Sequence, residues 1–215
     1  MFAVAKAATV LGIDGHIVDV EVDLSPGLPG FEIVGLPDVA LRESRQRVRA
    51  ALKNQGFGFP LQRLTVNLAP GDLRKTGAAF DLAIALGILA AGGIISQEQL
   101  DNILILGELS LDGTVRGVAG TLPMAMAGSK AGIKRILVPF ANGGEAGLVK
   151  GLSVAGVIDL AEAVGILQGR ITPKVPRPLE FQGFCQAQGP DLSQVKGQLG
   201  ARRALEIAAA GGHNI

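Results

Sequence analysis

Polar and apolar residues alternate over the first part of the chain. Two loosely alternating stretches within residues 3–23 flank a Gly-Ile-Asp-Gly sequence at residues 12–15, which predicts two strands joined by a hairpin turn. A loop rich in Pro and Gly over residues 23–30 and a third short strand over residues 31–34 follow. The pattern therefore predicts an antiparallel meander at the N-terminus.

A helical period replaces this alternation after the third predicted strand. Asp38 is a suitable N-cap, and apolar residues then recur at helical spacing to about Lys53, before Asn54 and Gly56. Beside the apolar face the predicted helix carries a basic stripe, formed by Arg42, Arg45, Arg49 and Lys53. A run of charge usually faces solvent. Four cations on one helix face can also follow a nucleic-acid backbone, so both interpretations stand.

A predicted strand over residues 61–68 leads through a polar loop into the most apolar stretch of the chain. The 14 residues from Leu82 to Ile95 include no polar side chain. A membrane span needs roughly 20 residues, so this run predicts a helix buried in a protein core. The preceding loop presents Arg74 and Lys75 at the start of that helix and is a candidate ligand site. It lacks the Gly before Lys of a nucleotide P-loop, and no such loop is predicted.

Strands and helices alternate after the buried helix. A near-continuous apolar strand over residues 103–109 is typical of a strand covered on both faces. The segments that follow are predicted as a turn with a short strand (111–118), a helix (121–130), a strand (135–138), a helix (145–150), a strand (152–155) and a helix (160–167). This order predicts an α/β (α+β) fold with a mixed sheet.

Changes in composition divide the chain into three predicted parts. Residues 1–168 form one domain, residues 169–190 form a Pro-rich extended linker, and residues 191–215 begin a new unit with a helix over residues 199–210. A lone helix has no core of its own. We therefore expect the chain to be cut just before a further module.

Composition narrows the range of functions. The formal net charge of +1 gives no global basic bias, and a chain with no Trp, no Tyr and eight Phe has few aromatic platforms for stacked bases. A single Cys185 and two histidines, His16 and His213, cannot build a Cys-based zinc cluster or a His-rich site, so no metal site is predicted. The first apolar run is broken by Asp14 and is too short for a signal peptide, which predicts a cytoplasmic protein without membrane contact.

The polar loop, the buried helix and residues 107–139 together resemble the proteolytic domain of Lon-type proteases, which has a ribosomal-protein-S5 domain-2-like fold. In that family a Lys-Asp-Gly-Pro-Ser-Ala-Gly loop carries a nucleophilic Ser, and a Gly-Gly-Leu-Lys segment carries the Lys that activates it. Aligned on this chain, the Ser position is Ala79 and the Lys position is Leu122. Ser–Lys acyl transfer needs both groups, so the resemblance implies the fold without catalytic residues.

A second resemblance covers the whole chain. Residues 1–52, 67–89 and 191–214 resemble, in order, the N-terminal part of the magnesium-chelatase-like AAA+ ATPases of the YifB/ComM type. There a Lon-like domain precedes the AAA+ module, so the resemblance implies that this chain ends before Walker A. It implies no cofactor in this chain, and ATP with Mg²⁺ for the full-length family member. By the same resemblance, Val195, Gly197 and Gln198 are expected near the adenine base.

The family resemblance implies a role in DNA recombination. Its best-known members form a hexameric ring that drives ATP-dependent branch migration during natural transformation. The leading hypothesis is a non-catalytic accessory domain that contacts DNA or organises the ring, with the basic stripe, Arg74 and Lys75 on one accessible surface. Three alternatives stay open: an assembly module without DNA contact, part of a magnesium chelatase ATPase subunit, and a cryptic peptidase with a Ser near a Lys at the loop.

Overall fold

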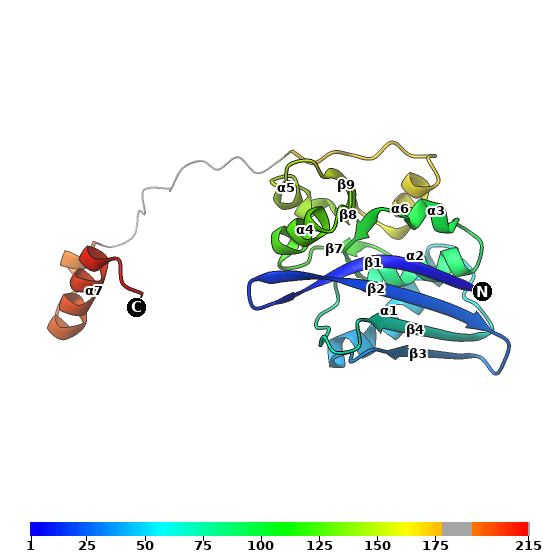
Figure 1. Cartoon of the computed structure of the whole chain (residues 1–215), viewed down its shortest axis with the longest axis horizontal. Helices are drawn as coiled ribbons and strands as arrows, with labels where there is room; N and C mark the ends of the chain where they lie inside the picture. Colours follow the sequence, from blue (N-terminus) through cyan, green and yellow to red (C-terminus); the bar gives the residue numbers. More distant parts are fainter. Residues whose placement is uncertain (178–190, 215) are drawn as a thin grey trace. The chain divides into compact units, whose positions relative to one another are not determined.

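The computed structural model describes residues 1–177 and 191–214. The chain divides into two compact units, Met1–Leu179 and Glu180–Ile215, and each is considered by itself (Figure 1). Within the described part, no helix combines the length and the apolar character that crossing a membrane requires.

A seven-stranded mixed sheet organises the first unit. Its strands, in spatial order, are β3 (Gly30–Val34), β4 (Arg63–Ala69), β2 (Asp14–Ser25), β1 (Phe2–Leu11), β5 (Ile103–Ile105), β8 (Arg135–Pro139) and β9 (Ser153–Val157). The β1–β2 and β2–β4 pairs are antiparallel, and the other neighbouring pairs are parallel. Two short strands, β6 (Glu108–Leu109) and β7 (Val115–Arg116), form a separate ladder. The predicted α/β (α+β) fold with a mixed sheet is confirmed.

The N-terminal hairpin forms as predicted, but the meander does not. Gly12 and Ile13 connect β1 to β2, and Gly12 has a φ of 65°, as the first central residue of a tight hairpin turn requires. The third strand, β3, does not pair with β2, because β4 lies between them and pairs with β3 in parallel. Alternation within a strand shows which side chains are buried but does not identify its neighbours in the sheet.

Helix α1 (Val39–Asn54) begins where the sequence predicts. The Asp38 carboxylate accepts a hydrogen bond from the Leu41 amide at 2.8 Å and caps the first turn. The buried face of the helix consists of Leu41, Ser44, Val48, Ala51 and Leu52.

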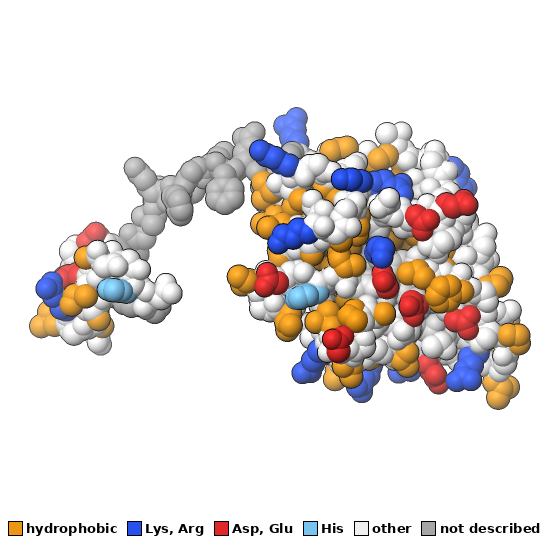
Figure 2. Space-filling view, in the orientation of Figure 1, with side chains coloured by type: hydrophobic (Ala, Val, Ile, Leu, Met, Phe, Trp, Pro, Cys, Tyr) orange, Lys and Arg blue, Asp and Glu red, His pale blue; other side chains and the backbone are white. Residues whose placement is uncertain are grey.

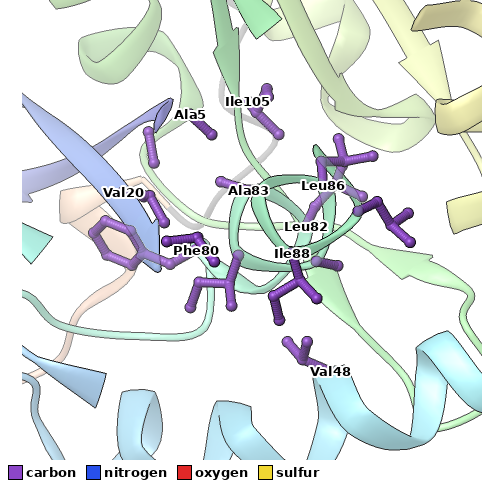
Figure 3. Packing of buried hydrophobic residues seen from close by; sticks show 14 of the residues in the cluster. Ala5, Val20, Val48, Phe80, Leu82, Ala83, Leu86, Ile88 and Ile105 are labelled. Atoms are coloured by element: carbon purple, nitrogen blue, oxygen red, sulfur yellow. The ribbon is translucent and has the colours of Figure 1, made fainter. Parts of the chain in front are cut away.

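Helix α2 (Asp81–Ala91) lies at the centre of the first unit. Ten of its eleven residues are buried, and the helix packs against β1, β2 and α1 (Figure 3). Gly87 allows the close approach to β2, since a Cβ there would lie 2.7 Å from Cγ2 of Val22. The prediction of a helix buried on all sides is confirmed. It ends at Gly92 and Gly93, short of Ile95.

The sheet has helices on both faces over only part of its width. Helices α1, α2 and α6 (Leu160–Leu167) contribute to one large apolar core, and α1 and α2 lie behind β1, β2 and β4 in Figure 1. Helices α4 (Thr121–Lys130) and α5 (Gly143–Ala146) help to enclose a smaller core with residues of β1, β5, β8 and β9. Helix α4 packs against the start of β2 near Gly15, and the outer face of the strand is open from Asp19 to Ser25, where half-buried side chains alternate with buried ones.

Short elements differ most from prediction. A one-turn helix, α3 (Gln97–Leu100), is present where the sequence pattern predicts none. The helix predicted over residues 145–150 is a 3₁₀ turn over Phe140–Asn142 that continues into α5.

The first part of the predicted linker contacts the first unit. Ile171 donates a backbone hydrogen bond to Gly165, Gly156 donates one to Lys174, and the Lys174 ammonium lies 3.0 Å from the Glu162 carboxylate. The rest of that prediction, residues 178–190 with Cys185, lies outside the described residues. In the second unit a 3₁₀ turn (Leu192–Gln194) precedes helix α7 (Leu199–Gly211).

Candidate functional site

The basic stripe lies on the exposed side of α1. All four of its side chains, Arg42, Arg45, Arg49 and Lys53, are solvent-accessible. Two of them are partly held by the fold: Arg45 donates to the carbonyls of Arg42 and Phe31 at 3.2 and 3.3 Å, and the Arg49 guanidinium lies 5.2 Å from the centre of the Phe59 ring. The stripe is therefore accessible, but two of its arginines are restricted.

The two predicted cations of the central loop have opposite environments. Arg74 is exposed, whereas the Lys75 side chain is fully buried and its ammonium donates to the Pro70 carbonyl. Burial lowers the pKa of Lys75 below its ordinary value, and the charge of Asp72 partly opposes this shift. The expectation that Lys75 shares an accessible surface with the stripe is therefore wrong. The backbone and the apolar stem of Lys75 anchor the loop, and the charged ammonium at the end of the stem is therefore buried with them.

Backbone contacts tie this loop to the start of α1. The Asp38 amide donates to the Lys75 carbonyl at 3.1 Å, and the Lys75 amide donates to Leu36 at 3.4 Å. The Asp38 carboxylate that caps α1 also accepts from the Gly77 amide at 3.1 Å. One carboxylate therefore stabilises both the helix start and the loop, and Arg74 belongs to a segment anchored at the start of α1.

A buried charged cluster joins α1, α2 and β6, and the sequence patterns missed it. The Asp81 carboxylate is fully buried and accepts from Arg47 at 2.6 and 3.1 Å, from the Leu109 amide at 3.2 Å and from the Ser44 hydroxyl. The hydrogen bond to Asp81 raises the pKa of Arg47 above its ordinary value. The sequence contained one signal for this cluster: Asp81 directly precedes the apolar run, and Arg47 lies on α1 outside the basic stripe.

A cavity of about 290 Å³ opens beside the start of α2. It is lined by Ala8–Val10 of β1, Thr76–Ala79 of the central loop, Glu108, Gly117–Ala119 and Met124. Ala79, at the position of the Lon nucleophile, is among these residues, and Leu122 is not. The lining includes neither Ser nor Lys. The cavity therefore does not supply the Ser beside a Lys that the peptidase alternative predicts.

The predicted adenine-side residues lie just before α7. Gly197 and Gln198 both have positive φ, 74° and 51°, which turns the chain into the helix. Arg202 donates to the Val195 carbonyl at 3.3 Å. Proximity to a nucleotide stays a prediction for these residues. Among residues 1–177 and 191–214, no three His, Cys, Asp or Glu side chains gather as a metal site would require.

Comparison with known proteins identifies the family. Residues 20–142, more than half of the chain, match the family described as "Subunit ChlI of Mg-chelatase", and residues 191–215 match "Magnesium chelatase, subunit ChlI". The chain belongs to the magnesium-chelatase-like AAA+ family of the YifB/ComM type.

Similarity to individual relatives extends over nearly the whole chain. The chain is 44% identical over 217 residues to an uncharacterized protein of Mycobacterium tuberculosis, 38% over 213 residues to YifB of Escherichia coli, and 39% over 218 residues to the competence protein ComM of Haemophilus influenzae. These alignments cover 98 or 99% of this chain and 42% of each relative. The chain thus spans about two fifths of the length of these curated relatives.

A weaker similarity supports the Lon-like fold. The chain is 28% identical over 137 residues to the Lon protease of Mesomycoplasma hyopneumoniae, an alignment that covers 60% of this chain and 15% of the protease.

Proposed function

We propose that this chain is a non-catalytic accessory domain of a DNA-remodelling AAA+ ATPase, and that the exposed face of α1 contacts the DNA backbone. The proposal includes a cytoplasmic hexameric ring that drives branch migration with ATP and Mg²⁺, as the family resemblance implies. The name of one relative, the competence protein ComM, supports only a role connected with competence. The observation that carries the DNA contact is the unequal distribution of charge over the first unit.

The two faces of the first unit differ in sign. Asp19, Glu21 and Asp23 form a half-buried acidic row on the open face of β2, and Figure 2 shows acidic side chains spread across this face. Lys6 lies 2.7 Å from Asp19 and the N-terminal ammonium lies 3.7 Å from Asp23, so the row is partly neutralised. The exposed side of α1 instead carries four cations beside one exposed carboxylate, Glu43. A polyanion would be repelled by the open sheet face and attracted to α1, because nucleic-acid affinity depends mainly on cations near phosphates.

Charge reversal on α1 tests the DNA contact. We expect Arg42→Glu with Lys53→Glu to weaken binding of a fluorescent DNA duplex at low salt. The dependence of log K on log salt should also become shallower, by about 1 for each phosphate that the variant no longer neutralises. The matched control is Lys134→Glu with Lys150→Glu, which removes two exposed cations outside α1. If the unmodified chain and both double variants bind DNA equally, the proposed contact is refuted.

An assembly module without DNA contact is the second candidate. It is favoured by the restriction of two stripe arginines, because Arg45 and Arg49 already interact with Phe31 and Phe59. In that case the charged side chains of α1 would keep the protein soluble or take part in contacts between subunits. The charge-reversal pair would then alter the sedimentation behaviour of the protein without changing its affinity for DNA.

A further inference from the structure

The C-terminal half of β1 has a free edge. Met1 and Leu24 exchange backbone hydrogen bonds, and in an antiparallel pair such bonded pairs alternate with non-bonded ones. Thr9 is therefore bonded to β2, whereas the amide and carbonyl of Val10 point the other way, towards the side of β5. The register pairs Lys6 with Leu104, and β5 ends at Ile105. Val10 thus extends past the end of its neighbour, and no described residue hydrogen-bonds to its peptide groups on that side.

The cavity beside α2 lies along this free edge. Its walls are Ala8–Val10 of β1, the loop residues Thr76–Ala79, and the segment Gly117–Ala119. Its volume of about 290 Å³ is near the lower end of the range for ligand pockets, roughly 300–1,000 Å³. It has room for a short piece of chain and not for a folded domain.

Thr9 contributes a polar residue to this cavity. The residue is 3% exposed and is one of those that line the cavity. Its hydroxyl is not one of the fully buried side-chain atoms that lack a partner among the described residues, so it carries no unsatisfied hydrogen bond. A ligand in the cavity would replace water as a partner of this hydroxyl.

The opposite wall supplies donors and one acceptor. The amides of Ala78 and Ala79, at the start of the eleven-residue helix α2, donate to no described residue, whereas the Gly77 amide is bonded to Asp38. Glu108 is partly exposed on the cavity wall and makes no ion pair with any described side chain. The cavity therefore combines free N–H groups, a free strand edge, a hydroxyl and one carboxylate.

We propose that this cavity binds an extended polypeptide segment of a partner protein, which adds to the free edge of β1 and places a basic side chain beside Glu108. An extended peptide presents carbonyls and amides in alternation, as the Val10 edge and the loop amides require, and addition to a strand edge is a recurrent mode of peptide recognition. Phosphate groups fit poorly because Glu108 would repel them. The cavity lining contains no aromatic side chain on which a base could stack.

The cavity lacks the Ser–Lys pair of the Lon-type peptidases, since its lining includes neither Ser, Cys nor Lys. The hydroxyl groups in the lining are those of Thr9 and Thr76. We assign binding of the segment to this cavity and no cleavage, whether or not α1 contacts DNA.

Titration with peptide pools tests the proposal on the intact chain. The probe is a pool of acetylated, amidated peptides with a central Arg flanked by mixed residues other than Pro, and the comparison pool carries Glu in place of Arg. At about 1 mM, a concentration that detects a Kd near 1 mM, we expect the Arg pool to shift the amide NMR signals of Thr9, Val10, Ala78 and Ala79 more than the Glu pool does.

Matched variants separate the cavity from the rest of the surface. Thr9→Val and Glu108→Gln should each weaken binding of the Arg pool about three- to tenfold, as expected for loss of one hydrogen bond or ion pair. Thr65→Val and Glu98→Gln, outside the cavity, should leave it unchanged. Thermal unfolding of each variant checks that the fold is retained.

Three results would overturn the proposal. The Arg pool could leave the cavity amides unshifted, both cavity variants could bind it as well as the unmodified chain, or an oligothymidylate could shift these amides while the peptides do not. The last result would assign the cavity to nucleic acid.

Discussion

Asp81 and Lys75 are both fully buried, and each is charged in its ordinary state. Asp81 is compensated by Arg47, Ser44 and the Leu109 amide. Lys75 is compensated chiefly by the Pro70 carbonyl. The difference matters because a buried charge is tolerated only when its partners replace the lost hydration.

Removing the partner of Asp81 should strongly destabilise the first unit. We expect Arg47→Met to lower the free energy of unfolding by about 3 kcal/mol, the lower part of the range for breaking a buried pair, since the Arg47 side chain is still 20% exposed. The measurement is urea unfolding, with Arg42→Met as an exposed control expected to change it by less than about 0.5 kcal/mol. Adding Asp81→Asn to Arg47→Met should recover part of the loss. Equal effects of the two single variants would contradict this account.

The lowered pKa of Lys75 makes a prediction about pH. Its ordinary value is 10.5, and in the folded chain it titrates below that value. Between the two values the unfolded chain binds more protons at this group, so its contribution to stability rises as the pH rises through this window. We expect the unmodified chain to gain stability relative to Lys75→Met as the pH approaches 10.5. Urea unfolding of both proteins across the window measures this difference, and a difference independent of pH would contradict the burial of a charged Lys75.

The helices that the sequence predicts correctly are those that depend on interactions between residues close together along the chain. Helix α1 begins after Asp38 because an Asp side chain caps a helix within the same turn. Helix α2 was recognisable because an apolar run of that length must be buried on every side. The neighbours of β3 were not recognisable, because its pairing with β4 joins segments about 30 residues apart along the chain.

At the scale of the whole chain, the positions of the two apolar cores determine which part folds by itself. Every residue of both cores lies at or before Leu167. Helix α7 is thirteen residues long and has one buried residue, Ala208, and isolated helices of about that length are marginal in water. The first unit is therefore the cooperative part of the described chain.

Truncation tests this conclusion. We expect residues 1–177 alone to unfold cooperatively, with a midpoint within about 2 °C of that of the whole chain, a shift smaller than about 1 kcal/mol would cause. Differential scanning calorimetry gives the midpoint, and circular dichroism should show loss of helical signal only. A fall of more than about 4 °C would mean that residues beyond 177 stabilise the first unit.

Local sequence was enough to predict the strands of the N-terminal hairpin, the capped start of α1, the buried helix α2 and the exposed basic stripe. These features depend on side chains close together along the chain. Folding alone established that Lys75 is buried while Arg74 is exposed, that Arg47 pairs with Asp81, and that β1 extends beyond β5 to leave a free edge beside a cavity. Burial and pairing of these groups depend on segments distant in sequence, whose contacts no local pattern records.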